Sequence, residues 1–270
     1  MDFTQTIAQL YSNMGINTRK LQTPVFFIEP IINLSSEQED QLKKGDGQTN
    51  PNEYKQMTSS TGLAVNYYKI LESTGMIENL CFEDKVEKPL QIRGGRYANI
   101  DVSYKRDNKQ YYIESKFLEP YYSGNEHNRP SYFEKNNYDV PKEDIDAWFN
   151  LLSIAQEYKL YNFSQLCRHL LAIWRKHSKD KQQQIVFQSV SWKMSDLFIE
   201  SLGDDELKET FLARRDGIEK ELKSCQGQIN DFLCQIGWTN MKFEVLHYND
   251  MLDDISSSIH LEEFKRRYFL

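Results

Sequence analysis

The sequence has few cysteines, and their spacing excludes two kinds of architecture. The four residues Cys81, Cys167, Cys225 and Cys234 form no CxxC pair. A structural zinc site is usually built from such closely spaced ligands, so the spacing disfavours one. A chain of 270 residues can also bury a full hydrophobic core without disulfides. We therefore expect four reduced thiols in a cytoplasmic protein.

Long apolar runs and an excess of positive charge are also absent. No stretch approaches the roughly 20 apolar residues of a membrane span, and the N-terminal residues do not have the pattern of a signal peptide. A soluble protein with no membrane partner is expected. The formal net charge of −7 argues against a surface coated with positive charge. Short clusters, such as Arg93 with Arg96, still leave room for a local basic channel.

The common motifs of nucleotide-binding proteins and serine hydrolases are missing. There is no Walker A loop and no GxGxxG sequence, which excludes phosphate cradles of those types. Ser189 or Ser191 with His247 lacks the elbow motif of a hydrolase triad. Aromatic residues, in contrast, make up 13% of the chain. Those between residues 104 and 148 are candidates for stacking on unpaired bases, although we favour a core role for them.

Periodicity and turn residues divide the chain into alternating helices and strands. The predicted helices span residues 1–20, 58–73, 143–160, 163–178, 204–236 and 250–268, and the predicted strands 80–92, 98–105, 110–117, 184–190 and 241–247. Residues 35–58 and 119–142 are rich in turn formers and predict loops. Such mixing predicts one α/β domain with a central mixed sheet flanked by helices. Residues 1–57 would form an N-terminal helix and polar loop packed on a core of residues 58–270.

The most informative segment is a predicted β-hairpin. Apolar and polar residues alternate on both sides of Asp107-Asn108, a pair that tolerates positive φ and favours a tight turn. Pairing about this turn places Asp101 opposite Glu114. Because side chains alternate along a strand, Asn99 and Lys116 share the face of these two acids. The apolar residues on the other face fix this register.

Two carboxylates side by side repel each other unless a cation lies between them. Asp101 and Glu114 therefore suggest a site for Mg²⁺, which prefers oxygen ligands and keeps places for water and phosphate. Lys116 on the same face would stabilise negative charge on phosphorus or lower the pKa of an attacking water. The other interpretation is an ordinary polar face on which Lys116 pairs with a carboxylate. Geometry alone weighs the two interpretations about evenly.

The segments around this hairpin resemble the PD-(D/E)xK, or restriction-endonuclease-like, nuclease superfamily. Asp101, followed after residues 102–113 by Glu114-Ser115-Lys116, is similar to the D…(D/E)xK motif. The approach from Arg93 to Asp101 and the ESK tripeptide resemble a group of uncharacterised bacterial members. Segments 59–68 and 165–171 resemble two helices of that group, so the resemblance covers roughly residues 58–176.

This resemblance implies a restriction-endonuclease-like core and a role for each residue of the motif. Asp101 and Glu114 would bind the metal together with the main-chain carbonyl of Ser115, and Lys116 would be the catalytic lysine. The proline of the motif's name is replaced by Ile100. An acid often found on the helix before the sheet has no clear counterpart here. The two candidates for that place are Glu72 and Asn66, so one bound metal is the expectation.

Further candidates lie on the helix predicted over 163–178. Gln165, Arg168 and His169 fall on one stripe of that helix. In the superfamily a glutamine near the ExK strand recurs, and it can orient water or a phosphate. Arg168, His169 and Asn99 would then contact the DNA backbone. The alternative for these side chains is an ordinary solvated surface.

The sequence therefore predicts a Mg²⁺-dependent nuclease, with Mn²⁺ as an alternative ion, that hydrolyses DNA phosphodiester bonds. The expected role is a restriction-like or genome-defence endonuclease. One alternative is a repair or recombination nuclease that recognises DNA structure, and another is a non-catalytic nucleic-acid-binding module of the same fold. RNA as a substrate and exonuclease action stay open. A double-strand cutter would need two sites, so a homodimer is a further expectation.

Overall fold

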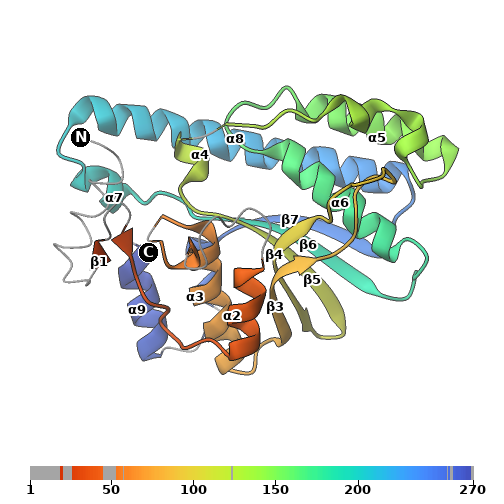
Figure 1. Ribbon diagram of the computed structural model, residues 1–270. Coiled ribbons are helices and arrows are strands. Elements are labelled where there is room, and N and C mark those ends of the chain that lie inside the picture. The colour runs from red at the N-terminus through yellow and green to blue at the C-terminus, as the bar shows by residue number, and fades with distance from the viewer. Residues whose placement is uncertain are drawn as a thin grey trace.

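Five strands form a mixed sheet at the centre of the protein (Figure 1). The computed structural model describes residues 19–20, 26–44, 53–56, 58–122, 124–253, 255 and 258–268. The strands follow the order β3 (Glu78–Lys85), β4 (Asn99–Arg106), β5 (Lys109–Lys116), β6 (Gln184–Ser191) and β7 (Met241–His247). The first three strands pair antiparallel, and the last three run parallel. The predicted α/β class with a central mixed sheet is confirmed.

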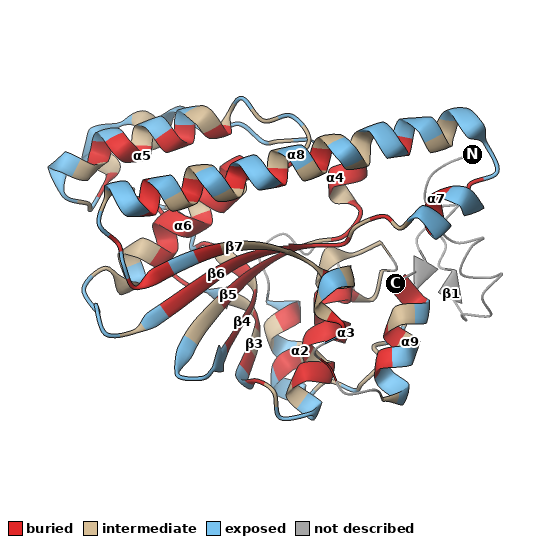
Figure 2. Cartoon of the chain, turned by 180° about the vertical axis from the view of Figure 1, so that it is seen from behind, coloured by how far each residue is buried: buried red, intermediate tan, exposed pale blue. Residues whose placement is uncertain are grey.

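Helices cover both faces of this sheet (Figures 1 and 2). One layer contains α2 (Ser36–Lys43), α3 (Ser60–Ser73) and α9 (Ile259–Tyr268), and the opposite layer contains α5 (Lys142–Ala155), α6 (Phe163–His177) and α8 (Asp205–Gln235). The shorter elements are β1 (Arg19–Lys20), β2 (Phe26–Phe27), α4 (Glu119–Tyr122), α7 (Asp196–Ser201) and the 3-10 turns Glu53–Lys55, Pro130–Phe133, Lys135–Asn137 and Tyr248–Met251. Both faces of the sheet are therefore withdrawn from water.

The hairpin of β4 and β5 has the predicted turn and register. Asp107 and Asn108 have φ of 50° and 60°, in the left-handed region that a two-residue hairpin turn requires. Tyr104 pairs with Tyr111, and Val102 pairs with Ile113. Because α3 and α6 lie on opposite sides, even the face with Glu114 is buried, and Glu114 is only 1% exposed. The polar face of the hairpin is thus an interior surface.

Helix caps place α3 and α6 against the hairpin. The hydroxyl of Ser59 accepts a hydrogen bond of 3.2 Å from the Gly62 amide at the start of α3. A β-carbon at Gly62 would lie 2.4 Å from the Tyr54 carbonyl oxygen, so only glycine fits there. At the start of α6 the Asn162 side chain accepts from the Gln165 amide at 3.1 Å. The two caps therefore fix the N-terminal ends of α3 and α6, the helices that lie on opposite sides of the hairpin.

Several predicted boundaries differ from the structure. The strand predicted over 80–92 ends at Lys85, and residues 86–98 form a loop that contains Gly94 and Gly95. The loop predicted over 35–58 contains α2, which a capping box of Ser35 and Gln38 begins. The final helix starts at Ile259 instead of near residue 250, and α7 was not predicted. The helix predicted over 1–20 lies outside the described residues except for 19–20. Residues 45–52 of the loop predicted over 35–58 also lie outside them.

Candidate active site

Asp101 and Glu114 come from the two neighbouring strands of the hairpin. The backbone ladder ends at the Val102–Ile113 pair, one residue before the two acids. Beyond that point the main-chain N–H of Ser115 donates a hydrogen bond of 2.7 Å to Oδ2 of Asp101. The side chain of Asp101, and not its backbone, therefore joins β4 to β5 at the position where direct opposition to Glu114 was predicted.

Glu114 and Lys116 form a buried ion pair. Nζ of Lys116 lies 2.6 Å from Oε1 of Glu114, and their side chains are 13% and 1% exposed. Burial opposes the ionised form of Glu114, but Lys116 and His169 outweigh it and lower the pKa of this carboxyl to about 2. Burial likewise opposes the Lys116 ammonium, but Glu114 and Asp101 raise its pKa well above the ordinary value. Both groups are therefore charged at neutral pH.

The second oxygen of Glu114 faces His169 on α6. Nδ1 of His169 lies 2.9 Å from Oε2 of Glu114. Neither atom has a hydrogen-bond partner of normal geometry, and both are buried. His169 was predicted as a supporting residue near the ExK strand, and the structure brings it against the acid of that motif. Both oxygens of Glu114 thus face a nitrogen atom, one of Lys116 and the other of His169.

Burial and the negative charge of Glu114 raise the pKa of Asp101 well above its ordinary value. Lys116 and the Ser115 amide act in the opposite direction but do not cancel this effect. A further contribution comes from Glu83, whose charge also raises the pKa of Asp101. The folded protein thus holds Asp101 where its negative charge is unfavourable, and a bound cation would stabilise that charge.

Glu83 on β3 was missed from the sequence. Phe82 pairs with Val102 and Asp84 pairs with Ile100, so Glu83 lies across from Asp101. Its φ of 53° is left-handed, which is uncommon for a residue that is not glycine. The Asn99 side chain donates a hydrogen bond to its carboxylate. A search for acids on the strand before the motif, instead of the helix, would have found it.

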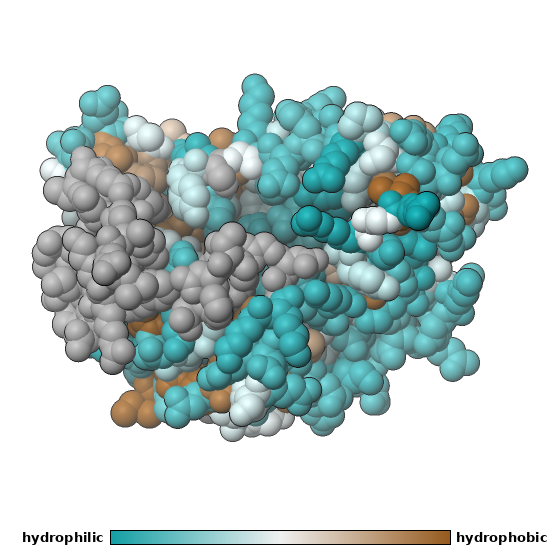
Figure 3. All heavy atoms as spheres, viewed as in Figure 1, coloured by the Kyte–Doolittle hydropathy of each residue, from teal (hydrophilic) through white to brown (hydrophobic). Residues whose placement is uncertain are grey.

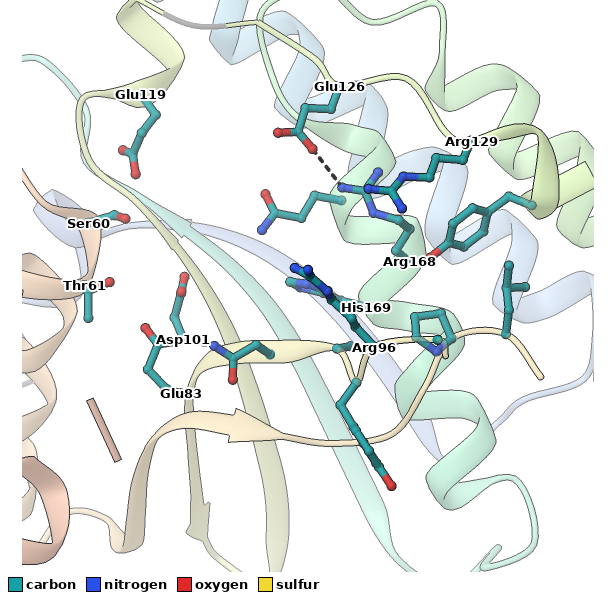
Figure 4. Close-up of a pocket in the computed structure, with 18 of the residues that line it drawn as sticks. Ser60, Thr61, Glu83, Arg96, Asp101, Glu119, Glu126, Arg129, Arg168 and His169 are labelled. Carbon is teal, nitrogen blue, oxygen red and sulfur yellow. Dashed lines mark hydrogen bonds and ion pairs between the residues drawn. The ribbon is translucent and has the colours of Figure 1, made fainter. Parts of the chain in front are cut away.

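A pocket of about 740 Å³ opens in front of these acids. Figure 4 shows Glu83, Asp101 and Glu119 on one side of it, and Arg96, Arg129, Arg168 and His169 on the other. Arg168 is held in place by Asn128 and by a 3.2 Å ion pair with Glu126. An acidic wall facing a basic wall suits a ligand that carries negative phosphates and binds a cation as well.

The structure brings five of the ten predicted site residues to this pocket. The residues of the prediction that line it are Asn99, Asp101, Gln165, Arg168 and His169. Glu114 lies directly behind Asp101 and His169. The Ser115 side chain turns toward α3, where its hydroxyl contacts the Ser60 carbonyl oxygen at 3.2 Å and the Tyr248 hydroxyl at 2.9 Å.

Asn66 and Glu72 on α3 do not reach the pocket. Asn66 is 6% exposed and accepts a hydrogen bond from the Ile31 amide, while its amide group donates to the Tyr268 hydroxyl at 2.8 Å. Glu72 bonds Lys69 and Gln38. These contacts fix α3 to its neighbours. Neither of these two candidates for the acid on the helix before the sheet lines the pocket, whereas Glu83 on β3 lines it beside Asp101.

The oxygen atoms at Asp101 and Glu114 suit a hard divalent cation. The raised pKa of Asp101 marks an unfavourable negative charge that a cation would relieve. In the described part of the chain, no three His, Cys, Asp or Glu side chains come together as metal ligands. An ion here would therefore keep several water or phosphate ligands, as Mg²⁺ usually does.

One protein family matches the chain over almost its whole length. The REase-ARP family model, described as "Restriction Endonuclease associating with ARP", matches residues 11–269. The chain belongs to this family. Membership in REase-ARP confirms the restriction-endonuclease-like fold, which the resemblance supported only for residues 58–176. Neither a curated protein nor a solved structure shows significant similarity to the chain.

Two further findings concern the expectations from composition. All four cysteines of this REase-ARP chain are free. Among the helices of the described residues, none is both long enough and apolar enough to cross a membrane. The face in Figure 3 is mostly hydrophilic, and the apolar residues on it form small, separate patches.

Proposed function

We propose that this REase-ARP protein is a metal-dependent nuclease that hydrolyses DNA phosphodiester bonds in the pocket at Asp101. The observation that carries the proposal is a charged group at the pocket: Glu114 holds Lys116 at 2.6 Å behind Asp101, and Asp101 lines a pocket with a basic wall. The family description, a restriction endonuclease, supports a nuclease. We propose a restriction-like or genome-defence role on the same ground.

Lys116 acts as a fixed positive charge. Since Glu114 and Asp101 raise its pKa, the side chain keeps its protons at neutral pH. It is therefore suited to stabilise the negative charge that develops on phosphorus, and unsuited to take a proton from water. Both roles considered from the sequence, stabilising charge on phosphorus and lowering the pKa of an attacking water, need a lysine that stays protonated.

Asp101 and Glu114 would hold Mg²⁺, or Mn²⁺ in its place, with the main-chain carbonyl of Ser115 as the resemblance implies. When bound, such an ion polarises the phosphate and lowers the pKa of its bound water. Gln165 and His169 line the wall beside these acids and are placed to orient a water or a phosphate oxygen. Arg96 and Arg129 on the basic wall would bind the flanking phosphates.

Plasmid cleavage tests this proposal. Wild type is incubated with plasmid DNA and Mg²⁺, Mn²⁺ or EDTA, beside Asp101→Ala and Lys116→Ala. Cleavage that needs the metal and falls at least about a hundredfold in both variants is expected. Asp146→Ala is the matched control, because Asp146 lies on α5 with 80% of its side chain exposed. Full activity of the Asp101 variant, or equal cleavage in EDTA, would refute a metal-dependent site here.

The proposal also includes two partners of the protein, ARP and a second copy of this chain. The family description names an association with ARP, and we propose the same association for this chain. Co-purification of the two proteins tests it. We also propose that two copies act together when both strands are cut, because one pocket cuts one strand. Light scattering of the protein bound to uncleaved DNA in EDTA would show a dimer, and a monomer on DNA would exclude this arrangement.

A further inference from the structure

Two exposed tyrosine rings lie at the pocket. Tyr97 is 49% exposed and Tyr122 is 58% exposed, and both line the cavity. Every other aromatic side chain whose burial the structure describes is buried or half-buried. Most of the aromatic residues between 104 and 148 are thus core residues, as favoured from the sequence. Isolated exposed rings are common, but the placement of both at one cavity indicates a ligand with flat apolar faces.

Tyr97 is presented by a closed loop. The Val86 amide donates to the Ala98 carbonyl at 3.1 Å, and the Ala98 amide donates to the Glu87 carbonyl at 2.7 Å, so residues 86–98 form a loop with a fixed base. Nζ of Lys88 lies 5.5 Å from the centroid of the Tyr97 ring. A positive charge therefore accompanies the ring, where the backbone of a stacked nucleotide would need one.

The cations nearest these rings are open to a ligand. Arg96 precedes Tyr97, and Arg129 lies on the same basic wall of the pocket; both are exposed. Among the described residues, no carboxylate forms an ion pair with either one. This differs from Arg168, which Glu126 already neutralises. The two arginines are thus available for the phosphates of a bound strand.

Both rings are also near the acids. Tyr97 precedes Asp101 by four residues, so their α-carbons are at most about 14 Å apart. Tyr122 ends α4, which begins three residues after Lys116. A strand whose phosphate lies at Asp101 would bring the bases of the next few nucleotides to these rings.

We infer that the pocket binds unpaired DNA, with bases stacked on Tyr97 and Tyr122 while Arg96 and Arg129 hold the backbone. The inference rests on the proposed function and names its substrate as a single strand or a duplex with an unpaired segment. In a continuous duplex the faces of the bases are covered by their neighbours, so rings at a pocket can stack only on bases that have left the helix.

Binding is measured separately from cleavage. Fluorescence anisotropy in EDTA compares three labelled DNAs of one sequence: a single strand, its duplex, and the duplex with a central unpaired loop. Unpaired DNA is expected to bind more tightly than the duplex. Tyr97→Leu and Tyr122→Leu should each weaken binding of unpaired DNA by about fivefold to a hundredfold. The matched variants Tyr97→Phe and Tyr122→Phe keep the ring and should bind like wild type.

Tighter or equal binding of the duplex would overturn the inference, and so would Leu variants that bind unpaired DNA like wild type. Leu and Phe variants that weaken binding equally would overturn it too, because the hydroxyl would then be responsible instead of the ring. The cleavage assay separates the two proposals. Preference for unpaired DNA without metal-dependent cleavage of any substrate supports stacking and refutes the nuclease. Cleavage without such preference supports the nuclease and refutes stacking.

Discussion

The hydroxyl of Tyr112 and Nε2 of His177 lie 2.7 Å apart and join β5 to the last residue of α6. Strand β5 also carries Glu114, and α6 also carries His169. This bond therefore joins the same two elements that bring Glu114 and His169 together. Burial and the charge of Lys176 lower the pKa of His177 to about 4, and the opposing effects of Asp180 and Asp84 do not compensate. The ring is therefore neutral, and its nitrogen can accept the Tyr112 proton.

The protein should lose stability in mild acid because of His177. The folded state has a pKa near 4, below the ordinary value of 6.5, so the unfolded chain binds the proton first as the pH falls. The contribution of His177 to the free energy of unfolding is fully present above about pH 6.5. It decreases toward pH 4, by roughly 1–2 kcal/mol for this half-buried group. Urea unfolding at several pH values measures it. His177→Gln should remove part of the decrease, while His260→Gln, at an exposed position on α9, should not.

Removal of the Glu114 charge should destabilise the fold strongly. Glu114→Gln leaves the Lys116 ammonium buried without its partner, a change that typically costs about 3–5 kcal/mol. The double variant Glu114→Gln with Lys116→Met should recover at least half of that loss, since neither charge remains. Urea unfolding of the two single variants and the double variant gives the coupling energy. Additive effects would show that the pair does not interact in the folded state.

Asp101→Asn should have the opposite effect on stability while it stops cleavage. Because the pKa of Asp101 is raised, the folded state loses stability as the pH rises through that pKa and the carboxylate forms. Asparagine stays neutral and still accepts from the Ser115 amide. We expect the free energy of unfolding of Asp101→Asn to exceed that of wild type by roughly 1–2 kcal/mol at pH 7 without metal.

Magnesium should reverse this order. Mg²⁺ raises the melting temperature of a protein whose folded state binds it, so wild type should gain several degrees and Asp101→Asn should gain none. Thermal melts with EDTA and with Mg²⁺ compare the two proteins. An equal gain in both would place the ion elsewhere.

Glu83→Gln should raise the Mg²⁺ concentration needed for half-maximal cleavage. Glu83 faces Asp101 and adds negative charge to the place where the cation would bind. Loss of that charge should weaken Mg²⁺ binding, and so raise this concentration by about tenfold to a hundredfold, as for other residues next to a metal ligand. Glu78→Gln is the control, since Glu78 is exposed at the start of the same strand. A titration that is unchanged in Glu83→Gln would leave this acid with a structural role only.

The hairpin could be predicted because its information is local. The turn at Asp107-Asn108 and the alternating apolar residues fix both the fold and the register of β4 and β5. The same holds for α3 and α6, whose caps Ser59 and Asn162 are visible in the sequence. Most elements that bring Asp101, Glu114 and Lys116 together therefore follow from short-range rules.

The rest depends on contacts between distant segments. Glu83 is eighteen positions before Asp101, and its place follows from the pairing of β3 with β4, which no local pattern reveals. The helical stripe with His169 predicted a side chain near the site, but not a buried ring at 2.9 Å from Glu114. Asn66 was a candidate because of a resemblance in sequence. In space it bonds Tyr268, more than two hundred residues away.

Asp101, Glu114 and Lys116 lie within residues 99–116, whereas Arg168 and His169 of the basic wall come from α6 at 163–177. A hairpin between adjacent strands closes in microseconds, but α6 reaches its place only when β6 pairs in parallel with β5 across a long connection. Under the proposed function, the cutting groups would thus come together in folding before the side chains of α6 that would contact DNA. A partly folded chain would hold the acids and the lysine without the rest of the pocket, so cleavage would need the complete domain.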